Sequence, residues 1–177
     1  MNRLVNGAAR AAALAGGAVL LALVAMTCLS IAGRAGLNLS GMFDLPAIFA
    51  RMRPVRGDYE LIEAGTAIAI CAFLPRATLV GTHARVDLLG AALSPRVDRA
   101  LTAFWDWLMV GTLAVLTWKL AEGMAAKQRS AETSFLLQLP VWWAYAACLG
   151  GLIIAVITAI WVAIGHHRRP VPTGSAA

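Results

Sequence analysis

Three ionisable side chains beside apolar segments are the first candidates for polar chemistry in this sequence: Arg34, Glu60 and Glu63. Glu60 and Glu63 are spaced i, i+3, so they share one face of a helix. An ionisable group in hydrocarbon costs about 2.5–3.5 kcal/mol even on a lenient insertion scale, which favours pairing. We expect Arg34 to lie at the same membrane level and to pair with one of these glutamates, within the chain or in a partner. The alternative is that all three are solvated at the interface.

The residue types that bind metals or catalyse reactions form no recognisable constellation. The three histidines lie outside the apolar segments, and Cys28, Cys71 and Cys148 have neither metal-ligand nor redox spacing. The sequence contains no phosphate-binding loop, nucleophile elbow or dinucleotide fingerprint. We therefore predict that the chain is not an enzyme and binds no cofactor or metal.

Small residues form a second pattern, a repeat every four positions in the last apolar segment: Ala147, Gly151, Ala155, Ala159 and Ala163. Faces of this kind let two backbones approach closely, which is how helices associate in lipid. We expect Gly151, Ala155 and Ala159 to make structural contacts or to contact a partner. The alternative is that an alanine-rich chain produces the repeat by chance.

Four apolar segments must position these residues, at about 11–32, 59–81, 100–121 and 140–164. About 20 helical residues, at 1.5 Å each, cross a hydrocarbon core of roughly 30 Å. Trp142 and Trp161 stand near the two ends of the last segment, as aromatic residues do at the headgroup level. The sequence predicts an all-α membrane protein, with one domain of four transmembrane helices over 1–177 and a flexible tail over 165–177.

Two connecting segments have semi-apolar patterns of their own. Asp44 can cap a short helix that carries Leu45, Ile48, Phe49 and Met52, and the segment 86–93 is similar in character. We expect short amphipathic helices at both places, lying on the membrane surface.

The overall composition excludes an ordinary soluble domain. Hydrophobic residues make up 60% of the chain and charged residues 14%, against roughly 45–50% and 25% in soluble proteins. The net charge of +6 comes from basic residues beside apolar segments, so we expect membrane lipids and no nucleic acid as partners. The first segment could be a signal peptide, but its length of about 22 residues exceeds the usual apolar region of roughly 7–15, and we expect it to be retained.

Charge bias decides the orientation only weakly. For four crossings, eight Lys and Arg residues lie on the side of the termini and seven on the other. Arg3 and Arg10 precede the first segment, whereas only Arg34 follows it closely. We therefore expect both termini to be cytoplasmic.

Several stretches together resemble a known family. They are GDYELIE at 57–63, GTHARVDL at 81–88, and ETS at 132–134 leading into LQLPVWWAY at 137–145. In this order they are similar to the small membrane subunit, DctQ, of tripartite ATP-independent periplasmic (TRAP) transporters. Arg85 and Asp87, in the second stretch, become further candidates for structural or partner contacts.

The resemblance implies a non-catalytic subunit in the bacterial inner membrane that binds a large multi-span permease subunit. The large subunit would hold the sodium and substrate sites and move as an elevator, while a periplasmic substrate-binding protein delivers an organic acid. The small subunit would act as a fixed membrane scaffold. Two other readings stay open: a self-sufficient small oligomeric transporter, for which Glu63 would be essential, and a membrane enzyme or redox carrier, which would bind a cofactor.

Overall fold

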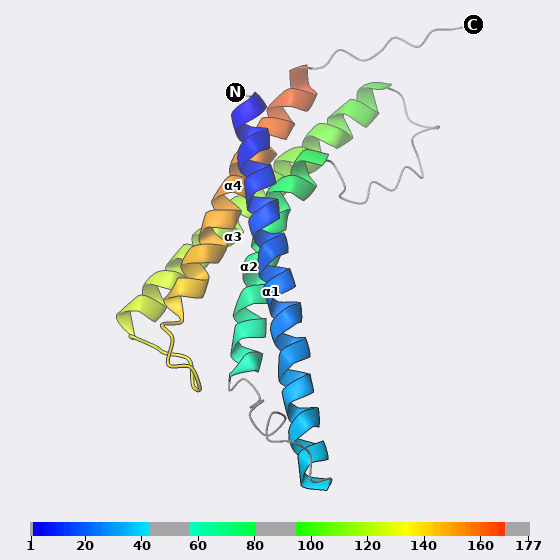
Figure 1. Cartoon of the computed structure of the whole chain (residues 1–177). Helices are drawn as coiled ribbons and strands as arrows, with labels where there is room; N and C mark the ends of the chain where they lie inside the picture. The colour runs from blue at the N-terminus through cyan, green and yellow to red at the C-terminus, as the bar shows by residue number, and fades with distance from the viewer. Residues whose placement is uncertain (1, 43–56, 81–94, 169–177) are drawn as a thin grey trace, which may run out of the picture.

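Four helices make up nearly all of the part of the chain that the computed structural model describes, residues 2–42, 57–80 and 95–168. They are α1 (Asn2–Met42), α2 (Asp58–Val80), α3 (Pro95–Arg129) and α4 (Trp142–Arg168). The helices alternate in direction, so the start of α1 and the end of α4 lie at the same end of the molecule (Figure 1). Each is long and apolar enough to cross a membrane. The predicted all-α membrane fold is confirmed.

Two of the four helices extend well beyond the predicted spans. The apolar run of α1 ends at Arg34, yet the helix continues to Met42. The predicted span 100–121 lies inside α3, which runs from Pro95 to Arg129. Hydropathy marks the part of a helix that suits hydrocarbon, whereas backbone hydrogen bonding continues until a breaker or cap stops it. By contrast, α2 agrees with the predicted span 59–81 to within one residue at each end.

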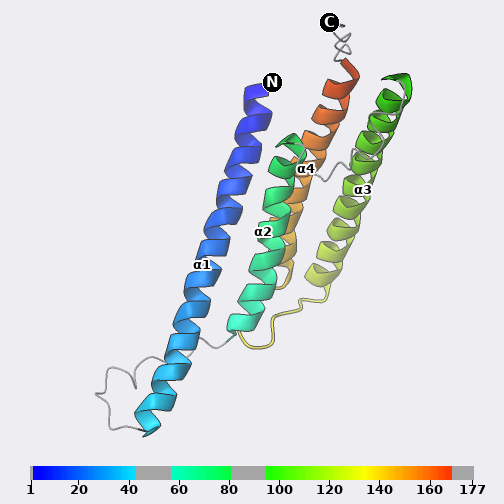
Figure 2. The same ribbon diagram turned by 90° about the vertical axis from the view of Figure 1, so that its right-hand side faces the viewer.

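The helices form an open row rather than a closed bundle. The closely packed pairs are α1 with α2, α2 with α4, and α4 with α3, and α1 touches α4 only slightly. Figure 2 shows the resulting order α1, α2, α4, α3. Within the described ranges, α3 therefore packs against α4 alone, and α1 and α3 form the two edges of the row.

The apolar core lies where α4 meets α2 and α3. Val110 and Leu113 of α3 pack against Leu152 and three alanines of the four-residue repeat, Ala155, Ala159 and Ala163. On the α2 side, Cys71 and Leu74 pack against the same cluster. The two inner helices therefore bury more of their spans than the two edge helices do.

The small-residue repeat of α4 is a close-contact face, but its partner is in the same chain. A Cβ at Gly151 would lie 2.7 Å from the carbonyl oxygen of Cys71 on α2. Ala155 is 0% and Ala159 4% exposed. Of the two kinds of contact expected for Gly151, Ala155 and Ala159, the described residues show the structural one, because α2 and α3 cover this face.

The junction of α1 and α2 also depends on glycine. A Cβ at Gly16 would lie 3.0 Å from the Cβ of Ala72, and one at Gly65 would lie 2.8 Å from Leu23 Cδ1. Ala69 and Ala72 are buried on the α2 side. Small side chains on both helices thus allow the close approach that favours helix association in lipid.

Several expectations fall outside the described residues. They are the two surface helices, expected near 44–53 and 86–93, the candidates Arg85 and Asp87, and the part of the expected tail beyond residue 168. The first residues of that tail are not separate from the last helix, since α4 continues through Arg168.

Candidate functional site: a polar cluster at one end of the helices

At the end of the molecule opposite the start of α1 and the end of α4, the first turn of α2 lies near α1 and the α3–α4 loop (Figure 1). Polar and charged side chains form a cluster there through hydrogen bonds and an ion pair. They come from three places: α1 near Arg34, the first turn of α2, and the α3–α4 loop over residues 130–141. The carboxylates of Asp58 and Glu60, both in that first turn, are at the centre of the cluster.

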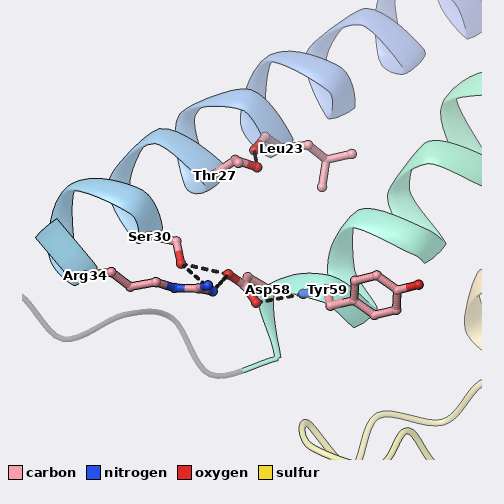
Figure 3. Close-up of polar contacts among 6 residues, drawn as sticks. All are labelled: Leu23, Thr27, Ser30, Arg34, Asp58 and Tyr59. Atoms are coloured by element: carbon pink, nitrogen blue, oxygen red, sulfur yellow. Dashed lines mark hydrogen bonds and ion pairs between the residues drawn. The ribbon is translucent and has the colours of Figure 1, made fainter.

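Asp58 connects the start of α2 to α1. Ser30 Oγ donates a hydrogen bond of 2.7 Å to Asp58 Oδ2, and the same oxygen forms an ion pair with Arg34 Nη2 (Figure 3). Asp58 Oδ1 accepts a hydrogen bond of 2.9 Å from the backbone N–H of Tyr59. Ser30 is only 1% exposed, so this carboxylate satisfies a hydroxyl that is otherwise enclosed between helices.

Arg34 forms its ion pair with the start of α2, but not with either of the two glutamates that were expected to bind it. Arg34 pairs with Asp58 rather than with Glu60 or Glu63. Asp58, at the first position of α2, is directed at α1, whereas Glu60 is directed at the α3–α4 loop. The i, i+3 spacing of Glu60 and Glu63 therefore identified residues on one side of α2, but that side does not face Arg34.

Glu60 connects α2 to the α3–α4 loop. Its Oε1 accepts a hydrogen bond of 2.8 Å from the backbone N–H of Leu136. Its Oε2 accepts one of 3.2 Å from the N–H of Leu137 and another from Ser134 Oγ. One carboxylate thus receives two backbone donors and one hydroxyl from a single turn of the loop. Hydrogen bonds to a charged acceptor of this kind are stronger than those between neutral groups.

The loop that Glu60 binds has a defined conformation. Thr133 and Pro140 form an antiparallel bridge, and the N–H of Ser134 donates a hydrogen bond of 2.8 Å to the carbonyl of Leu139. Ala131 and Gln138 adopt left-handed backbone angles, with φ of 48° and 54°. Outside the turn, Lys127 Nζ forms a 2.6 Å ion pair with Glu132 Oε2 that joins the end of α3 to the loop.

Gly57 allows this loop to pack on the start of α2. Its φ is +81°, a backbone conformation that residues with a Cβ rarely adopt. A Cβ at this position would also lie 2.7 Å from Leu137 Cγ. Position 57 therefore requires glycine for both its conformation and its contact.

Two of the stretches that carry the family resemblance consequently meet in space. The stretch 57–63 supplies Gly57, Asp58 and Glu60, and the stretch 132–145 supplies the loop that receives Glu60. The sequence patterns alone assign no role to Asp58, Ser30 or Ser134. The only signal that pointed to Asp58 and Ser134 was their presence in those stretches, and Ser30 had none.

Glu63 of α2 is the third ionisable candidate from the sequence. Its side chain is exposed, and within the described residues it has no hydrogen bond or ion pair. In the same part of the chain, no three His, Cys, Asp or Glu side chains come together as metal ligands. Apart from the bond between Asp58 and the N–H of Tyr59 within α2, the hydrogen bonds and the ion pair described above for Asp58 and Glu60 join one element of the chain to another. The cluster is therefore a structural junction between α1, α2 and the α3–α4 loop.

The fold and the cluster together define a multi-pass membrane protein whose polar end groups hold its helices together. The family model for the DctQ component of tripartite ATP-independent periplasmic transporters matches residues 23–169. That range includes most of the chain, and the chain belongs to this family, the small permease component of TRAP transporters. No curated protein and no solved structure matches the chain.

Proposed function

We propose that this subunit is a non-catalytic membrane scaffold for the large, elevator-type subunit of a TRAP transporter, in the sodium-coupled uptake of an organic acid. The large subunit carries the solute and sodium sites and moves, while the small subunit stays fixed. A periplasmic substrate-binding protein delivers the solute to the pair.

One observation carries the scaffold role: the two carboxylates of the polar cluster bind parts of this same chain. Asp58 joins α2 to α1 and Glu60 joins α2 to the α3–α4 loop. A stationary element must keep its helices in a fixed relative arrangement while its partner moves. Charged hydrogen bonds between helix ends serve that purpose because they restrain the helices relative to one another.

The proposed location is the bacterial inner membrane, with both termini in the cytoplasm. The described helices support this arrangement because the start of α1 and the end of α4 lie at one end of the molecule (Figure 1). In this orientation the polar cluster lies on the periplasmic side, where the substrate-binding protein arrives.

A transport assay tests the scaffold role directly. Proteoliposomes that contain this chain alone should take up no more of any labelled organic acid than empty liposomes do. The buried hydroxyls of Ser30, Thr78 and Thr158 all donate hydrogen bonds within the chain, so they are not free to replace the hydration of a carboxylate. Adding the large subunit, the binding protein and a sodium gradient should restore uptake. Uptake by the isolated chain would contradict the proposal and favour a self-sufficient oligomeric transporter.

Reporter fusions test the orientation. Green fluorescent protein fused after Ala177 should fluoresce, and alkaline phosphatase fused at the same place should be inactive, because the phosphatase matures only in the periplasm. The near-equal charge counts on the two sides make this a demanding test. An active phosphatase fusion would place the termini and the polar cluster on the opposite sides to those proposed.

A further inference from the structure

The outward face of α3 carries a continuous seam with the spacing of a helix-pairing surface. The seam consists of two sets of three residues, each with a spacing of seven: Phe104, Gly111 and Trp118, and, starting four residues later, Leu108, Val115 and Glu122. Together they repeat every 3.5 residues, the period at which one helix keeps the same face towards a partner helix. The four large apolar members are 45–64% exposed, and α4 packs on the opposite face of α3, through Val110 and Leu113.

The middle of this seam is hollow. A depression of about 460 Å³ is lined by six residues of α3: Trp107, Leu108, Gly111, Thr112, Val115 and Leu116. A Cβ at Gly111 would meet nothing within 4 Å, so the glycine is not required by packing inside this subunit. The seam therefore has bulky side chains on both sides of a gap that fits a large side chain from another helix.

One end of the seam carries charge. Gly123 of α3 lies beside Tyr145, since a Cβ there would be 3.0 Å from the Tyr145 ring. Lys119 lies one turn, about 6 Å, further from that end of α3. Its Nζ forms a 2.8 Å ion pair with Glu122 Oε2, with side-chain exposures of 66% and 50%. Both side chains are exposed, so a hydrogen-bonding or charged group on a neighbouring helix can pair with them.

The other edge of the row has a different character. The exposed large residues of α1 are aliphatic: Leu4, Leu14, Leu20, Leu21, Val24, Leu29 and Ile31. Between Arg10 and Arg34 that helix has no charged or aromatic residue. Such a surface suits lipid chains, so the two edges of the row are not equivalent.

We propose that the outward seam of α3 is the docking surface for a transmembrane helix of the large permease subunit. That helix places a large aliphatic side chain in the depression at Gly111 and a hydrogen-bonding or charged group opposite Lys119 and Glu122. A second copy of this chain fits less well. In a two-fold dimer through this seam Gly111 would face Gly111, and the depressions would be doubled instead of filled. The inference rests on the proposed scaffold function.

Filling the depression tests this surface. Gly111→Leu, in tagged small subunit co-expressed with its large subunit, should lower the recovery of the large subunit in mild detergent by about tenfold, which corresponds to about 1.4 kcal/mol. Gly17→Leu on α1 and Gly150→Leu on α4 are matched controls, because a Cβ at either glycine also meets nothing within 4 Å. Both controls should recover the large subunit at the wild-type level, with equal amounts of inserted protein.

A photo-crosslinking residue at Val115 identifies the occupant independently. It should give a product with the combined mass of the small and large subunits, and the same residue at Leu21 of α1 should not. A product of twice the small-subunit mass, or crosslinks to lipid alone, would overturn the inference. Equal recovery with Gly111→Leu and the controls would overturn the docking surface but leave the scaffold function. Failure of the wild-type chain to recover the large subunit would overturn both.

Discussion

Replacing Gly151 with alanine is expected to destabilise the subunit by about 1–3 kcal/mol, the usual range when a methyl group is forced into a well-packed interior. The new Cβ would lie 2.7 Å from the carbonyl oxygen and 2.8 Å from the carbonyl carbon of Cys71. These are backbone atoms of α2, so no side-chain rotation can relieve the contact, and the two helices must move apart. Leucine at this position should be more harmful still.

The adjacent glycine provides the control for this variant. A Cβ at Gly150 meets nothing within 4 Å, so Gly150→Ala should leave the thermal unfolding of the purified subunit in detergent at or slightly above the wild-type temperature. The tryptophan fluorescence of the chain can follow the transition. Equal unfolding temperatures for Gly150→Ala and Gly151→Ala would mean that α2 and α4 do not come into close contact at Gly151.

The membrane-crossing part of the fold could be predicted from the sequence because hydropathy measures directly which segments suit hydrocarbon. Helix ends could be predicted less well. Nothing in the composition near Arg34 indicates that α1 continues to Met42, since charge marks the edge of the membrane and not the end of a helix.

The rotation of each helix about its axis could not be predicted from the sequence. The repeat of Gly151, Ala155 and Ala159 correctly identified a close-contact face, but a periodic pattern does not say whether the contact lies within the chain or with a partner. The same limit explains why Arg34 was assigned to a glutamate. The direction of the first turn of α2 depends on packing with α1 and on the α3–α4 loop, which are distant in sequence.

The α3–α4 loop was the least predictable part of the site. Its conformation depends on left-handed backbone angles at Ala131 and Gln138, residue types that do not favour them. It also depends on a carboxylate more than 70 residues earlier in the chain. In the sequence, only the family resemblance, which rests on 57–63 and 132–145 together, links the two regions.

The carboxylate of Glu60 is expected to control the order of this loop. In Glu60→Gln the side-chain amide can turn either way, but in each orientation an NH₂ group replaces one acceptor oxygen. At least one of the N–H groups of Leu136 and Leu137 then faces a donor instead of an acceptor. Backbone hydrogen exchange over residues 134–137 should accelerate on the order of tenfold or more. The reason is that losing a hydrogen bond to a charged carboxylate lowers the free energy needed to open the loop locally.

Hydrogen exchange followed by mass spectrometry, in detergent or in a lipid nanodisc, measures this effect on the peptide that contains residues 134–137. Glu63→Gln is the matched control, since it makes the same change one turn further along α2 on an exposed side chain. It should leave exchange in the loop unchanged, and exchange in the middle of α4 should be the same in both variants. If Glu60→Gln and Glu63→Gln gave the same loop exchange, the loop would be ordered by its own bridge between Thr133 and Pro140. The junction between α2 and the loop would then not depend on Glu60.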